Sequence, residues 1–174
     1  MRYLFQGGKQ MKLNYKYGLV AVLAGVFLFI PVFLTPYAFG GYNPKITFFD
    51  ALNASGLTVF VGVLGLLTMI AAILLIVYGA LLFTNIATKE LTKFAMTVII
   101  VVSSLALLTA IFAIIDAVSN GWGVDAKPGV GTILYLVFGV LAIAGALVVK
   151  FTDKKPVKKS KESTKETAKE PAKK

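Results

Sequence analysis

Four long runs of apolar residues, separated by short polar segments, dominate the hydrophobic pattern of this chain. The longest stretch without Asp, Glu, Lys or Arg covers 38 residues, from Ala51 to Thr88. A charged side chain at the centre of a bilayer costs at least about 2.5 kcal/mol on insertion scales, so runs of this length indicate membrane-spanning helices. A helix needs about 20 residues to cross the hydrocarbon. The four predicted spans are residues 19–39, 58–83, 94–115 and 131–149.

Short connections between the spans predict an all-α membrane protein, a four-transmembrane-helix bundle of up-down-up-down topology. Residues 1–17 precede the bundle, which occupies 18–149, and a Lys-rich tail follows at 150–174. The tail repeats like charges at a four-residue spacing and has no apolar face, so we predict that it is disordered. Two alternatives stay open at the N-terminal end. Translation starts either at Met1 or at Met11, and in the second case residues 1–10 are a leader or tag. The first span is either a retained helix, which we favour, or a cleaved signal peptide.

The positive charges lie almost entirely on one side of the predicted membrane. Of the 18 Lys and Arg residues, only Lys45 and Lys127 fall in the segments assigned to the outside, and the other 16 lie with the two termini. The positive-inside rule therefore places both termini in the cytoplasm. A chain with one arginine, Arg2, and many lysines is typical of an AT-rich bacterial genome, so we expect the bacterial plasma membrane.

A polybasic segment follows the last span directly. Each lysine near anionic lipid contributes about 1 kcal/mol of attraction, so we expect this segment to contact anionic headgroups. Nucleic acid is a less suitable partner because the segment lacks arginine and aromatic residues. The residues assigned to lipid contact are Lys154, Lys155, Lys158 and Lys159.

The composition excludes most enzyme chemistry. Only 15% of the residues are charged, against about 25% in a soluble domain, and the mean hydropathy is +0.82. The chain contains no Cys and no His, which removes disulfides, thiolate nucleophiles, imidazole bases and the usual ligands of zinc, haem and iron–sulfur clusters. We therefore predict no enzyme, no catalytic residue, no cofactor and no metal.

Small residues recur along one face of the predicted spans, where they allow helices to approach closely. In the third span their spacing alternates between three and four, which is the seam of a left-handed crossing of about +20°. The second span carries a similar stripe. The predicted helix-packing residues are Ser103, Ala106, Ala110, Ala113 and Ala117 in the third span and Gly62, Gly65, Ala72 and Gly79 in the second.

The segment before the second span has the pattern of a helix start. Thr47 and Asp50 fit a capping box, so we expect a helix to begin near Thr47, with a break at Gly56. Phe48 and Phe49 are then expected at the membrane surface or against the other outer loop.

Asp116 lies at the C-terminal end of the third span, where the helix dipole disfavours an anion. It therefore needs water or a partner. Three interpretations are open: a solvated carboxylate, which we favour, an outer ion pair with Lys127 or Lys45, or a cation or ligand site.

The fourth span opens with Lys127-Pro128-Gly129-Val130-Gly131-Thr132-Ile133-Leu134-Tyr135. Together with the longer first outer loop and the tight inner turn, this layout resembles small four-pass, claudin-like or tetraspan-like membrane proteins of bacteria. The loop Trp and the paired Cys of true claudins are missing, so the resemblance implies no functional residues and does not favour a role in cell–cell adhesion.

We therefore expect a non-enzymatic integral membrane protein, acting as a structural, scaffold, accessory or immunity-type subunit. Its partner would be another membrane protein or a second copy of the chain. The alternative is a small oligomeric pore or transporter. The predicted spans contain no ionisable group, whereas ion-coupled carriers usually need one, and this favours the first interpretation.

Overall fold

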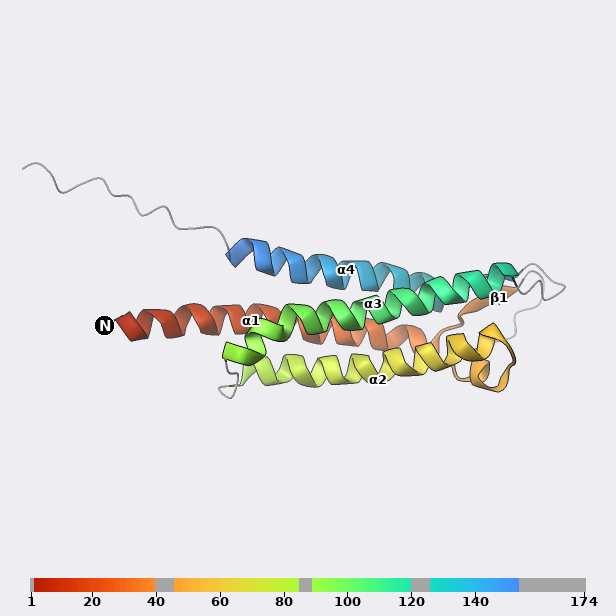
Figure 1. Ribbon diagram of the computed structural model, residues 1–174, viewed down its shortest axis with the longest axis horizontal. Helices are drawn as coiled ribbons and strands as arrows, with labels where there is room; N and C mark the ends of the chain where they lie inside the picture. Colours follow the sequence, from red (N-terminus) through yellow and green to blue (C-terminus); the bar gives the residue numbers. More distant parts are fainter. Residues whose placement is uncertain (1, 40–45, 85–88, 120–125, 154–174) are drawn as a thin grey trace, which may run out of the picture.

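A computed structural model describes residues 2–39, 46–84, 89–119 and 126–153 (Figure 1). Four helices lie side by side along the long axis: α1 (Arg2–Phe29), α2 (Leu57–Phe83), α3 (Lys89–Ser119) and α4 (Val130–Asp153). Each helix packs against the next one along the chain, and α4 also packs against α1. The predicted all-α, up-down-up-down bundle is confirmed. Residues 2–10 form the first part of α1, and their assignment as a leader or tag stays a prediction.

All four helices contain segments long and apolar enough to cross a membrane: Asn14–Phe33, Leu57–Phe83, Glu90–Ser119 and Val130–Thr152. The chain is thus a multi-pass membrane protein. Side chains on the outside of the bundle are large and apolar, and exposing this much apolar surface to water would be unfavourable. Leu74, Val101 and Val118 are 62%, 61% and 77% exposed.

The first predicted span, 19–39, is wrong at its outer end. The α-helix stops at Phe29 and continues as the 3-10 helix η1 (Ile30–Phe33), in which Pro31 cannot donate an amide hydrogen bond. Residues after η1 then form the strand β1 (Tyr37–Phe39), which pairs antiparallel with β2 (Ala126–Pro128). The sequence pattern predicted neither strand.

The paired strands join the end of α1 to the start of α4. Beyond the strand pairs, Gly129 N donates to Pro36 O at 2.7 Å and Gly131 N donates to Thr35 O at 2.9 Å. A side chain at residue 129 would collide with the Thr35 carbonyl, so the close approach requires glycine there. We call β1–β2 the ribbon, the end of the bundle that carries it the ribbon end, and the opposite end, where α1 begins and α4 ends, the terminal end.

The segment before α2 contains the predicted capping box. The Thr47 amide and hydroxyl donate to Asp50 Oδ2 at 2.7 and 2.8 Å, and the Asp50 amide donates to Thr47 Oγ1 at 3.3 Å. The box opens only a short 3-10 helix, η2 (Asp50–Asn53), and the break predicted at Gly56 follows, with φ of 66°. The region is therefore a folded-back turn and not a continuous helix from Thr47.

Candidate functional site

Asp116 is fully buried in the last turns of α3 at the ribbon end. Its Oδ2 atom accepts hydrogen bonds from the Tyr37 hydroxyl at 2.5 Å and from Thr58 Oγ1 at 2.8 Å. The favoured interpretation of a solvated carboxylate is therefore wrong. A carboxylate is tolerated inside a membrane protein when other groups solvate it, and here hydroxyls from β1 and α2 do so. We call Asp116, Tyr37 and Thr58 the carboxylate cluster.

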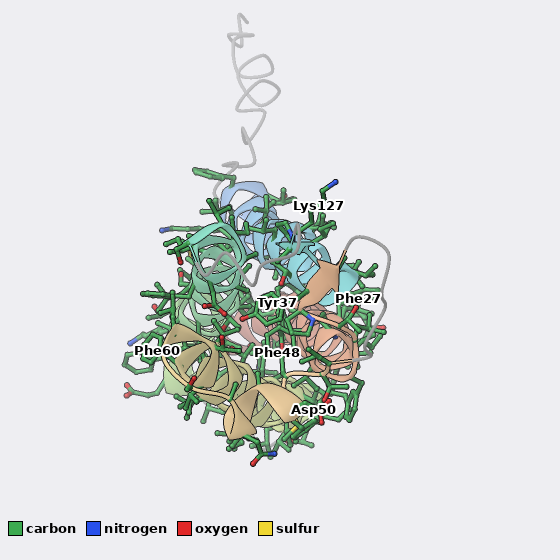
Figure 2. All side chains as sticks on the ribbon, turned by 90° about the vertical axis from the view of Figure 1, so that its right-hand side faces the viewer. Phe27, Tyr37, Phe48, Asp50, Phe60 and Lys127 are labelled. Carbon is green, nitrogen blue, oxygen red and sulfur yellow. The ribbon has the colours of Figure 1, made fainter. Side chains whose placement is uncertain are left out.

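The structure does not bring the predicted pair of Asp116 and Lys127 together. Lys127 is exposed on β2 and stands in register with Ala38, whereas Tyr37 stands in register with Pro128. Because successive side chains of a strand leave opposite faces, the Lys127 side chain points away from the face that carries Tyr37. Figure 2, viewed from the ribbon end, shows Lys127 at the periphery and Tyr37 in the centre of the bundle. The other proposed partner, Lys45, lies outside the described residues.

Burial and charge together fix the protonation of Tyr37. Removal from water raises the pKa of its phenol far above the ordinary value, and the hydrogen bond to Asp116 and the charge of that carboxylate raise it further. The phenol therefore stays protonated and acts as a hydrogen-bond donor across the physiological range. The cluster thus ties three elements that are distant in sequence, namely β1, α2 and α3.

Asp50 offers a contrast at the same end of the molecule. Its pKa is lowered because the Thr47 backbone amide, and then the Thr47 hydroxyl, stabilise the anion. A lowered folded pKa means that the cap is present above the ordinary pKa of an aspartate and is lost as the pH falls through the lowered value. Figure 2 shows Asp50 at the margin of the bundle, so this carboxylate caps a turn and takes no part in the buried cluster.

Phe48 is buried in the interior between α2 and α4. It is 1% exposed, and its ring meets Tyr135 of α4 edge to face with a centroid separation of 5.3 Å. The expectation that Phe48 lies at the membrane surface is wrong. A Cβ atom added at Gly65 would lie 2.5 Å from this ring, so the glycine in α2 provides the notch that admits it. Phe49, the next residue, is 37% exposed.

Tyr135 of α4 carries a buried hydroxyl that, unlike the other buried hydroxyls of the described residues, has no hydrogen-bond partner. The side chain is fully buried, and among the described residues its hydroxyl is the buried side-chain oxygen that lacks a hydrogen-bond partner. One turn earlier on α4, Thr132 donates to Pro36 O at 2.8 Å. Helix α4 is therefore held to the segment between η1 and β1 by a side chain as well as by backbone bonds.

Further hydroxyl contacts follow the interior toward the terminal end. Thr68 and Thr109 share a hydrogen bond of 2.9 Å between α2 and α3. At the terminal end, Thr92 Oγ1 donates to Asn14 Oδ1 at 2.6 Å, and the Tyr78 hydroxyl donates to a backbone carbonyl of α3. These contacts bind helix to helix and involve neutral groups, so they stabilise the bundle and supply no acid or base.

All nine predicted helix-packing residues are buried. Gly62 lies under the backbone of η2, where an added Cβ would be 2.8 Å from Leu52 N. Gly79 lies against α1, where an added Cβ would be 2.8 Å from Val22 N and 2.9 Å from Gly18 O. The remaining members are Ser103, Ala106, Ala110, Ala113 and Ala117 of α3 and Gly65 and Ala72 of α2.

Sequence reasoning identified Asp116 but missed its partners. Tyr37 fits an aromatic at the membrane interface, and Thr58 fits an ordinary membrane-helix threonine. A signal was present nonetheless, because a carboxylate near a helix C-terminus needs donors and both hydroxyls lie near the same predicted boundary. The lipid-contact lysines, from Lys154 to Lys159, lie outside the described residues. Within the described ranges, no group of three His, Cys, Asp or Glu residues is placed to hold a metal ion.

Comparison of the chain with protein-family models, with curated protein sequences and with solved structures gave no match. The resemblance to small claudin-like proteins therefore stays a prediction.

Proposed function

We propose that this chain is a non-enzymatic membrane subunit, of scaffold, accessory or immunity type, that acts through its lipid-facing helix surfaces and its ribbon end. The observation that carries the proposal is the filled interior along α2. At Gly62, Gly65 and Gly79 an added methyl group would come within 2.5–2.8 Å of a neighbouring atom. A bundle packed this closely has its available contact surface on the outside.

The exterior supports the same proposal. Large apolar side chains cover the outside of α2 and α3, and a neighbouring helix that packs closely against them gains van der Waals contact. A neighbouring helix from another membrane protein, or from a second copy, is the partner that this chemistry suits. The charge asymmetry supports cytoplasmic termini, and the lysine bias supports a bacterial plasma membrane.

Photocrosslinking in native membranes tests the proposal. A photoreactive amino acid is placed singly at Leu74, Val101 and Val118, which are exposed, and at Ala110, which is fully buried, as the matched control. We expect at least one exposed position to give a discrete protein adduct that also co-purifies in a fixed ratio, while Ala110 gives none. Adducts with lipid alone at all three exposed positions, from a chain that purifies as a monomer, would contradict the proposal.

A small pore or transporter is the second candidate, and one observation favours it. Asp116 is fully buried in α3, within the candidate span Glu90–Ser119 and one residue beyond the predicted span 94–115. A buried ionisable group therefore lies next to the predicted span, although the span itself contains none. Ion and proton pathways through membrane proteins are commonly marked by such a residue.

Ion flux distinguishes the two candidates. Liposomes that contain only this protein are given a proton or sodium gradient, and the wild type is compared with Asp116→Asn and with Asp50→Asn, which removes a carboxylate outside the bundle interior. Flux that Asp116→Asn abolishes and Asp50→Asn leaves intact would establish the transporter. Absence of flux from correctly folded wild type supports the subunit.

A further inference from the structure

A hollow of about 260 Å³ separates α1 from α4 on the lipid-facing side of the bundle. Its wall on α1 is formed by residues between Val20 and Phe27, and its wall on α4 by residues between Phe138 and Gly145. All of these side chains are apolar. Leu23 and Leu141 on its rim are 46% and 60% exposed, so the hollow opens outward toward the surrounding lipid.

An aromatic pair closes the hollow toward the ribbon end. There the rings of Phe27 and Phe138 stack with a centroid separation of 5.0 Å and an interplanar angle of 29°. On the terminal side the wall is formed by Val20 and Gly145, and an added Cβ at Gly145 would first meet Val20 at 3.4 Å, which is an ordinary contact. An elongated apolar group that lies in the hollow along the two helices therefore stops at the aromatic pair.

A basic residue lies on the terminal side of the hollow. Lys16 lies four residues before Val20 on α1, which places it one turn nearer the terminal end on the same helix face. It lies two residues after the start of the candidate span Asn14–Phe33, and we place the lipid headgroups at this end of the span. Lys150, which is exposed, lies at the same end on α4. The terminal end as a whole carries the excess of positive charge.

The distance from the basic side chain to the aromatic stop matches one lipid chain. Lys16 and Phe27 are 11 residues apart, which corresponds to about 16 Å along a helix. Half of the hydrocarbon core of a bilayer is about 15 Å thick. A phospholipid of the leaflet at the terminal end therefore reaches the stacked rings with its acyl chain while its phosphate stays beside Lys16.

We propose that the α1–α4 hollow binds one acyl chain of an anionic phospholipid, with the phosphate held by Lys16 on the terminal side of the hollow. The site is separate from the carboxylate cluster and does not depend on the proposed function. An anionic headgroup is preferred because Coulomb attraction to a lysine at the headgroup level adds to the apolar contact in the hollow.

Photoreactive lipid probes test the site. The full chain in nanodiscs is exposed to phosphatidylglycerol that carries a diazirine near the end of its acyl chain, and labelled residues are identified by mass spectrometry. We expect labels at Leu23 and Leu141, with Val101 on the outside of α3 as the reference for ordinary annular lipid. Substituting phosphatidylcholine with the same acyl chain should lower labelling of the hollow at least threefold and leave Val101 unchanged.

Two variants separate the tail site from the headgroup site. Gly145→Leu fills the hollow and should reduce labelling of Leu23 at least fivefold for both lipids. Lys16→Gln should remove the preference for phosphatidylglycerol, while Lys93→Gln, which removes an exposed charge from α3, should retain it. Circular dichroism and thermal unfolding confirm that each variant is folded. Equal labelling of the hollow and of Val101 in every variant, or a cross-linked dimer through Leu141 in place of lipid adducts, would overturn the proposal.

Discussion

Helix α1 packs differently against α2 and against α4. Against α2 it is in close contact, because Gly18 faces Gly79 and a Cβ at Gly25 would lie 2.8 Å from the Ala72 carbonyl oxygen. Against α4 it borders a hollow between Val20 and Phe27, and the segment that follows η1 is hydrogen-bonded to the start of α4. Glycine residues of membrane helices therefore have opposite roles at the two interfaces.

The difference shows how a membrane bundle divides its surface. At the α1–α2 interface glycine removes volume so that two backbones can approach, and any added atom must displace a neighbour. At the α1–α4 interface Gly145 removes volume without a backbone moving into the space. Interior space must be filled by the chain itself, whereas a space that faces lipid can be filled by lipid.

The largest expected effect comes from opening a space inside the bundle. Phe48→Ala removes a fully buried ring that no lipid can replace, and we expect the free energy of unfolding to fall by about 3 kcal/mol. Phe49→Ala, at the neighbouring exposed position, is the control and should change it by less than about 0.5 kcal/mol. Unfolding in SDS at constant lipid content measures both. Equal losses would show that the ring of Phe48 is not inside the bundle.

A methyl group should distinguish the two interfaces of α1. Gly79→Ala places a Cβ 2.8 Å from the backbone of Val22, so we expect a loss of about 2 kcal/mol through overpacking. Gly145→Ala meets nothing nearer than 3.4 Å and should leave the stability unchanged within about 0.5 kcal/mol. The same unfolding assay compares the two. A similar cost at both positions would mean that the α1–α4 interface is as closely packed as the α1–α2 interface.

The ribbon end should respond to loss of a single hydroxyl. Tyr37→Phe keeps the ring but removes the hydroxyl that donates to the Asp116 carboxylate, and hydrogen bonds to charged groups contribute about 1.5–3 kcal/mol. We expect a loss near the lower limit, about 1.5 kcal/mol, because Thr58 still donates. Adding Asp116→Asn to Tyr37→Phe should cost less than the sum of the two single changes, which a double-mutant cycle measures. Additivity would indicate that the two side chains do not interact.

The smallest expected effect is at the pair Thr68 and Thr109. Hydrogen bonds between membrane helices contribute about 0.6 kcal/mol on average, so the coupling energy from a double-mutant cycle with valine at both positions should be near that value. A coupling above about 2 kcal/mol would contradict this expectation and show that the pair dominates the α2–α3 interface.

The fold was largely predictable because length and hydropathy decide it. Charge-free runs of adequate length identify membrane helices whatever their contacts, and the boundaries of α2 agree within one residue with the prediction. The ends of α1 and α3 were less predictable. The strand at Tyr37 depends on pairing with residues about 90 positions away, and a pattern read within a short window does not contain that information.

The candidate site was predictable only in part. The need of Asp116 for a partner follows from the helix dipole and from the bilayer, but the choice among water, lysine and hydroxyls depends on how the ribbon folds over the helix ends. Phe48 illustrates the same limit. Its neighbour Phe49 has the same chemistry, and only the notch at Gly65 decides which ring enters the bundle.

The bonds from Gly129, Gly131 and Thr132 to the carbonyls of Thr35 and Pro36 have a consequence for biogenesis. A ribosome delivers the chain from its N-terminus, so the acceptors between η1 and β1 reach the membrane before their donors have been synthesised. Water or lipid headgroups must solvate them during that interval. The bundle therefore matures only when its last hydrophobic segment leaves the translocon, and a nascent chain truncated before residue 129 would expose those carbonyls to membrane quality control.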